Sequence, residues 1–136
     1  MRVISILAAA TALTSCTMSA APQSNELASQ HEYQQLIGDK VAQAPVSCLP
    51  HYLSGDMRVI NDETIAFRNG NARVYVAHMQ GGCNNLAQGH NALVTHQYGN
   101  AQLCRGDIAH VVDTLNGFTV GSCVFGDFVP YIRPSH

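Results

Sequence analysis

A hairpin sequence stands near the middle of this chain and reads Thr64-Ile65-Ala66-Phe67-Arg68-Asn69-Gly70-Asn71-Ala72-Arg73-Val74-Tyr75-Val76-Ala77. Ile65 and Phe67 alternate with other residues in its first part, and Val74 and Val76 do so in its second part. Alternation with a period of two indicates strands with one apolar face. Asn69-Gly70 is the strongest hairpin signal in the chain, because a type I′ turn needs the positive φ angles that Asn and Gly tolerate. The sequence therefore predicts an antiparallel hairpin.

Further short runs rich in Val, Ile, Thr, Tyr and Phe lie on both sides of this hairpin. They cover residues 57–60, 92–97, 108–113, 118–125 and 127–132. Gly, Asn and Asp separate them at close spacing, which is typical of antiparallel strands. Pro130 places the last run at an edge or strand end, because proline cannot donate to a ladder. A short turn of helix is expected over residues 86–90. These runs predict a mainly β fold, either a small antiparallel barrel or a compact sandwich.

The N-terminal region has the pattern of an exported protein. Arg2 precedes an apolar run of roughly ten residues, which suits a signal peptide and falls well short of the ~20 residues of a membrane-spanning helix. The division expected from the sequence is a signal peptide over 1–15, a flexible tether over 16–24, a short helix over 25–40 and the antiparallel β domain over 41–136.

The apolar run ends in Leu13-Thr14-Ser15-Cys16, which resembles the lipobox of bacterial lipoproteins. The resemblance implies cleavage after Ser15 and lipidation of Cys16. Two or three acyl chains would anchor the protein stably to a membrane. Thr17 is not the aspartate that resembles an inner-membrane retention signal, so the outer membrane is the expected destination. The alternative is a simple secreted protein in which Cys16 is coincidental.

The charged residues argue against binding of nucleic acid. The full chain of 136 residues carries a net charge of −2, and Lys40 is its only lysine. The arginines are spread singly along the sequence. Binding of nucleic acid needs clustered cations that neutralise phosphates. We therefore expect no nucleic-acid partner.

Five cysteines occur in the chain. If Cys16 is lipidated, an even set remains in an oxidising compartment, namely Cys48, Cys83, Cys104 and Cys123. Two disulfides are expected, and each would stabilise the domain by about 2–4 kcal/mol. Three pairings are possible, and the spacing alone does not choose among them.

Four short motifs together resemble a family of small proteobacterial envelope proteins that is defined only as a domain of unknown function. They are Arg73-Val74-Tyr75, Gly82-Cys83-Asn84-Asn85-Leu86, Leu103-Cys104-Arg105-Gly106-Asp107, and Cys123 followed by Phe128-Val129-Pro130. The match covers roughly residues 46–132. The resemblance carries no activity, but it implies a Cys83–Cys123 disulfide, which leaves Cys48 to pair with Cys104.

No catalytic, cofactor or metal site is expected from the residue patterns. His90, His96 and His110 with Cys83 and Cys104 are candidate zinc ligands, but they lack the close ligand pairs of zinc sites. No Cys-x-x-Cys or Gly-x-Ser-x-Gly motif is present. Asp107, Asp113 and Asp127 are expected to cap backbone N–H groups, and Gly106 to shape a turn. Tyr52, Tyr75, Tyr98, Tyr131, Phe125 and Phe128 are expected on half-buried sheet faces and not in a ligand groove.

These observations favour a non-catalytic, membrane-anchored periplasmic domain with an envelope protein or glycan as partner. The alternative is a periplasmic hydrolase of an envelope polymer that uses histidine and aspartate as acid and base. A pocket with converging His and Asp side chains would favour the hydrolase. A shallow surface with an exposed apolar patch would favour the binding domain.

Overall fold

The computed structural model describes residues 24–50, 56–96 and 102–135. One helix, α1 (Ser24–Ile37), precedes seven strands. The strands are β1 (Val41–Ala42), β2 (Met57–Asn61), β3 (Thr64–Asn69), β4 (Arg73–Gln80), β5 (Asn91–Thr95), β6 (Ile108–Asp113) and β7 (Thr119–Ile132). Within the described ranges, no helix is long and apolar enough to cross a membrane. The mainly β fold expected from the sequence is confirmed.

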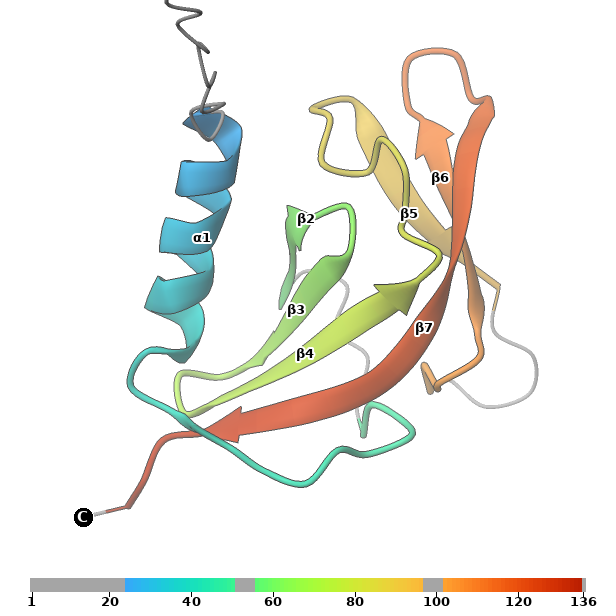
Figure 1. Cartoon of the computed structure of the whole chain (residues 1–136). Coiled ribbons are helices and arrows are strands. Elements are labelled where there is room, and N and C mark those ends of the chain that lie inside the picture. Colours follow the sequence, from blue (N-terminus) through green and yellow to red (C-terminus); the bar gives the residue numbers. More distant parts are fainter. Residues whose placement is uncertain (1–23, 51–55, 97–101, 136) are drawn as a thin grey trace, which may run out of the picture.

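All strands belong to one antiparallel sheet in the order β2-β3-β4-β7-β6-β5, and β1 pairs with the end of β7. The sheet curls into a half-barrel (Figure 1). The last three strands follow one another by hairpins, and β7 returns to lie beside β4, which is a Greek-key arrangement. The half-barrel thus has two parts, β2–β3–β4 and β5–β6–β7, joined along the β4–β7 pair.

Strand β7 corrects one expectation from the sequence and agrees with one of the two alternatives for Pro130. Residues 118–125 and 127–132 do not form separate strands, because β7 runs unbroken for 14 residues. Pro130 lies near the end of β7, but between neighbouring strands and not at a free edge. Its carbonyl accepts from the N–H of Gln43 at 2.7 Å. Because N and C=O of a residue point to the same side of an antiparallel strand, the Pro130 nitrogen faces the Gln43 side, and the β4–β7 ladder loses no donor.

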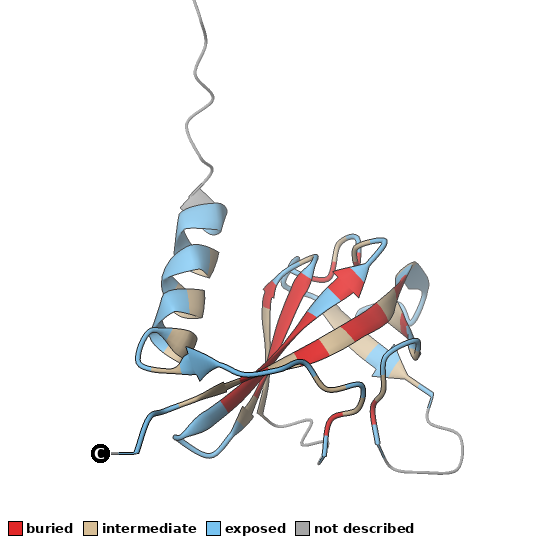
Figure 2. Ribbon diagram, turned by 60° about the horizontal axis from the view of Figure 1, so that its bottom comes forward, coloured by how far each residue is buried: buried red, intermediate tan, exposed pale blue. Residues whose placement is uncertain are grey.

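The main core lies inside the half-barrel. Figure 2 shows that the buried residues of the sheet are concentrated in its middle strands. Phe67, Phe125 and Phe128 form its aromatic centre, with ring centroids 5.8–6.3 Å apart. Leu49 and Leu103 come from segments outside the strands and are completely buried in the same core. Aromatic pairs at this spacing add to the stabilisation from area burial alone. The inner residues of both sheet halves therefore pack as one unit.

A second cluster lies on the outer face of β2–β3–β4, beneath α1. Its buried members are Ile60, Ala66, Val74 and Val76, and Tyr33, Leu36, Ile37 and Tyr131 pack against them. The helix residues in this contact are spaced three or four apart, as one helix face requires. The rest of α1 is largely exposed, which agrees with the weak amphipathic pattern of its sequence.

Two turns differ from the sequence predictions. The hairpin after β3 exists, but Asn69 pairs with Arg73, so that Gly70, Asn71 and Ala72 form a three-residue loop. Gly70 has a φ of 65°, whereas Asn69 does not have the positive φ of a type I′ turn. The expected helical turn over 86–90 is instead a series of turns, with i to i+3 bonds from Leu86 to Cys83 and from Gln88 to Asn85.

Candidate functional site

The structure forms two disulfides, as expected for an exported domain. Cys83 bonds to Cys123 and Cys48 bonds to Cys104, which are the pairs implied by the resemblance to the envelope family. Cys83 and Cys123 are buried in the main core, whereas Cys48 and Cys104 are half-buried and join two segments outside the strands. Cys16, the expected lipidation site, lies outside the described residues.

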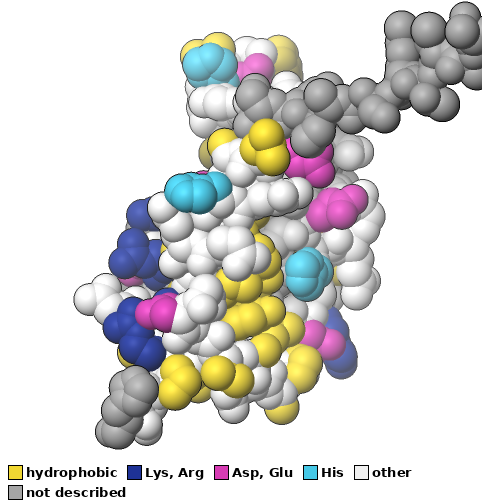
Figure 3. All heavy atoms as spheres, turned by 60° about the vertical axis from the view of Figure 1, so that its left-hand side comes forward, with side chains coloured by type: hydrophobic (Ala, Val, Ile, Leu, Met, Phe, Trp, Pro, Cys, Tyr) yellow, Lys and Arg dark blue, Asp and Glu magenta, His cyan; other side chains and the backbone are white. Residues whose placement is uncertain are grey.

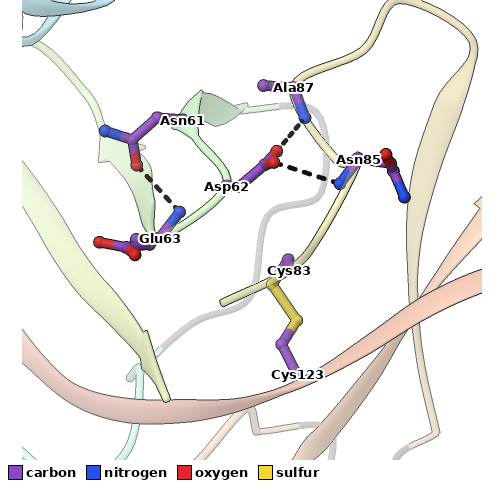
Figure 4. The surroundings of a disulfide bond; sticks show 7 residues. All are labelled: Asn61, Asp62, Glu63, Cys83, Asn85, Ala87 and Cys123. Carbon is purple, nitrogen blue, oxygen red and sulfur yellow. Dashed lines mark hydrogen bonds between the residues drawn. A yellow bond between two sulfur atoms is a disulfide. The ribbon is translucent and has the colours of Figure 1, made fainter. Parts of the chain in front are cut away.

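Asp62, in the β2–β3 turn, fixes the loop that contains Cys83. Its carboxylate accepts from the backbone N–H groups of Asn85 at 3.1 Å and of Ala87 at 2.7 Å (Figure 4). Its carbonyl accepts from the N–H of Cys83 at 2.5 Å. Hydrogen bonds to a carboxylate are about twice as strong as neutral ones. Sequence reasoning missed this role because the partners are more than twenty residues away in the chain.

A groove of about 510 Å³ separates the N-terminal half of α1 from the β2–β3 turn. It is the place where a hydrolase would have its acid and base, since Glu26, Asp62, Glu63 and His78 line it. Nδ1 of His78 lies 3.4 Å from Oγ1 of Thr64, beyond the ~2.6–3.2 Å of an activated nucleophile and its base. Of the described carboxylates none hydrogen-bonds to the His78 ring, and Asp62 is held by backbone donors. The groove therefore brings carboxylates and one histidine together, but these side chains are not placed as a catalytic acid, base and nucleophile.

The described histidines do not gather around a metal position. His96, directly after β5, and His110 on β6 have ring centroids 6.1 Å apart. Cys83 and Cys104 are bonded to other cysteines and cannot ligate. Across the residues that the structure describes, no group of three or more His, Cys, Asp or Glu side chains is placed to hold a metal ion.

The acidic residues near turns have mainly structural partners. Asp107 accepts from the N–H of Cys104 at 2.7 Å, and Asp113 accepts from the N–H of Leu115 at 2.8 Å. These two caps confirm the expectation. Asp127 instead pairs with Arg105 across an exposed surface. Gly106 has a φ of 92° in its turn, as expected.

The described aromatic residues pack on the two faces of the sheet. Tyr75, Phe125 and Phe128 are buried in the main core, and Tyr131 packs against the cluster beneath α1. Tyr52 and Tyr98 lie outside the described residues. The expectation that these side chains serve the sheet faces is confirmed for the described members.

The most unusual surface is the outer face of β5–β6–β7, which α1 does not cover. We call it the open face and define it by Val94, Ile108, Val112 and Val124, which lie on one side of three neighbouring strands. Val94 is 38% exposed and Ile108 is 55% exposed. Leu115 and Phe118, at the tip of the β6–β7 hairpin, are more than 70% exposed. Exposed apolar residues in this number are typical of an interaction surface.

No protein-family model, curated protein or solved structure matches this chain. The resemblance to the family of small envelope proteins therefore stays a prediction. The function has to be inferred from the surfaces and side chains of the chain itself.

Proposed function

We propose that this protein is a lipid-anchored, non-catalytic domain on the periplasmic side of a bacterial membrane, the outer membrane being the favoured one, and that it binds another envelope protein through the open face. The observation that carries the proposal is the exposure of Val94 and Ile108 on a sheet face that no other described element covers. The lipobox-like Leu13-Thr14-Ser15-Cys16 supports the anchor. The paired cysteines agree with an oxidising compartment.

The proposed partner is an extended protein segment that pairs as a strand with the free edge of β5. Its outward side chains would then lie beside the apolar residues of the open face. Strand β5 ends the sheet, and within the described ranges no strand pairs with its free edge. Soluble proteins protect such edges with lysine, proline or bulges, and β5 contains neither lysine nor proline. Main-chain pairing at the edge would supply affinity, and the neighbouring apolar side chains would supply specificity.

Hydrolysis of an envelope polymer is the less favoured function. Its best location is the groove beside α1, where the Asp62 carboxylate is already occupied by the N–H groups of Asn85 and Ala87. A general acid or base needs a side chain that is free to exchange a proton with substrate. The hydrogen bonds to Asp62 support a structural role for this carboxylate.

In-cell photocrosslinking tests the binding function. A photoreactive residue at position 108 should give one discrete adduct, whereas the same residue at position 27 should give none. Leu27 is the matched control, because it is 54% exposed against 55% for Ile108 but lies on α1. Val94→Lys should abolish the adduct without unfolding the protein, since a lysine blocks strand addition. Equal labelling from both positions, or an adduct that survives Val94→Lys, would refute this partner mode.

Intact-mass measurement of the membrane fraction tests the anchor. The mature chain should begin at Cys16 and carry added acyl mass, and Cys16→Ser should block processing. An unmodified N-terminus elsewhere on a soluble protein would contradict lipidation and leave the binding test unaffected.

A further inference from the structure

A basic pocket of about 490 Å³ lies on the α1 side of the molecule, away from the open face. The charged side chains that line it come from α1 and the segment after it, from β2 and β3, and from the segment after β7, namely Glu32, Lys40, Arg58, Arg68 and Arg133. Four of the six lysines and arginines that the structure describes thus surround one pocket in a chain whose net charge is −2. Figure 3 shows Lys and Arg side chains gathered along one side of this face.

Of the four cations that line the pocket, Arg58 and Arg68 are the two that form no ion pair with a described carboxylate. Arg58 on β2 pairs with Ala66 on β3, and Arg68 follows two residues later on the same face. Diagonal neighbours of this kind have Cα atoms roughly 7–8 Å apart, within reach of one ligand group for two long side chains. No described carboxylate pairs with either guanidinium, and Arg58 makes its one hydrogen bond to the carbonyl of Met57 at 2.9 Å. Like charges so placed repel each other unless an anion lies between them.

The other two cations are already held in place. Nζ of Lys40 donates to the carbonyl of Leu36 at 2.8 Å and pairs with Asp39. Arg133 donates through Nε to the same Asp39 carboxylate at 2.6 Å. Asp39 thereby offsets part of the positive charge of Lys40 and Arg133. Glu32 is the one carboxylate among the described residues that line the pocket. The four cations exceed these two acids, so the pocket keeps a positive charge that Arg58 and Arg68 leave unmatched.

We propose that the basic pocket binds a phosphate group, with the guanidinium groups of Arg58 and Arg68 as its direct ligands and Lys40 and Arg133 as supporting charges. The planar guanidinium fork matches the oxygen geometry of phosphate and donates two parallel hydrogen bonds. Gly70 and Asn71 line the same pocket, and the Asn71 amide adds a polar group. The phosphate can belong to a soluble molecule or to a phospholipid headgroup, since both present the same oxyanion. This site is independent of the open face.

Nuclear magnetic resonance titration of the full-length protein in detergent micelles tests the site. The probes are inorganic phosphate, micelles doped with phosphatidylglycerol, and micelles doped with phosphatidylcholine, which carries a phosphate but no net charge. The test variant is Arg58→Gln/Arg68→Gln. The control variant is Arg73→Gln/Arg105→Gln, which removes the same charge at two arginines that do not line the pocket. Equal midpoints of urea unfolding for the two variants establish that both are folded.

Inorganic phosphate should shift the side-chain N–H signals of Arg58 and Arg68, and the test variant should bind it at least tenfold more weakly than the wild type and the control. If only phosphatidylglycerol shifts these signals, and only when both arginines are present, the bound phosphate is that of a lipid headgroup. Equal weakening in the control variant would show general charge attraction and overturn the site. Absence of any shift of the two arginines with all three probes would also overturn it. Neither result would affect the crosslinking test of the open face.

Discussion

The two halves of the curled sheet share one inner core and differ in their outer faces. Beneath α1, Val74 and Val76 on β4 are at most 2% exposed, whereas Ile108 on β6 is 55% exposed. Both halves place apolar side chains on their outer face, so the alternation of residues does not explain the difference. What differs is that α1 lies over β2–β3–β4 and no described element lies over β5–β6–β7 (Figure 1). One outer face is thus part of the folded core, while the other stays exposed.

Loss of the disulfide in the shared core should have the largest effect and should affect both halves alike. The Cys83–Cys123 link closes a separation of 40 residues and the Cys48–Cys104 link one of 56, for which chain entropy gives about 4 kcal/mol each. Cys83→Ala/Cys123→Ala should cost more than Cys48→Ala/Cys104→Ala, because it also removes core packing. Urea unfolding should rank the two variants. Loss of hydrogen-exchange protection in only one half would contradict a shared core.

An aspartate on each of the two outer faces should change the free energy of unfolding by very different amounts. Val76→Asp puts a charge beneath α1 where the side chain is completely buried, and it should lower the free energy of unfolding by about 3 kcal/mol. Ile108→Asp on the open face should change it by no more than about 0.5 kcal/mol. Urea denaturation of both proteins measures the difference. Similar losses would mean that the open face is covered in the free protein.

The smallest of the three effects is expected at alkaline pH, which should weaken the contact between α1 and the sheet and so lower the stability of the fold. Burial, with a hydrogen bond from the Tyr33 hydroxyl to Tyr131, raises the pKa of Tyr33 from its usual 10.0 to about 12. Because the folded state holds this proton more tightly, the stabilisation is complete below pH 10 and is lost as the pH rises toward 12. In Tyr33→Phe the decline of stability with pH should be shallower.

The ultraviolet absorbance of tyrosinate and the urea midpoint at each pH together check this prediction. The absorbance titration of the wild type should contain a component near pH 12 that Tyr33→Phe lacks. An unchanged titration in the variant would show that Tyr33 is not protected by the helix contact.

Local sequence patterns were sufficient where the structure depends on neighbouring residues. The alternation in residues 64–77 and the glycine at position 70 predicted the β3–β4 hairpin, because strand periodicity and positive φ are local properties. They did not predict the three-residue loop of that hairpin. They also did not predict that Pro130 lies between two strands, because this depends on the Gln43 segment lying on the side of β7 where proline has no N–H to donate. The unbroken β7 was also missed, because Gly126 in its middle resembles a turn residue. A Cβ at this position would collide with the His78 carbonyl, so close approach of β4 accounts for the glycine.

The sequence by itself determined the mainly β class, the short helix, the even set of cysteines and the expectation of a lipid anchor at Cys16. Only the tertiary structure decided which surfaces exist. Arg58, Arg68 and Arg133 are spread singly along the chain, yet antiparallel pairing and the return of β7 beside β4 bring them to one pocket. The position of α1 likewise covers Val76 and leaves Ile108 in water. The physical reason is that charge clusters and exposed faces depend on contacts between residues distant in sequence, whereas strands, turns and export signals depend on adjacent residues.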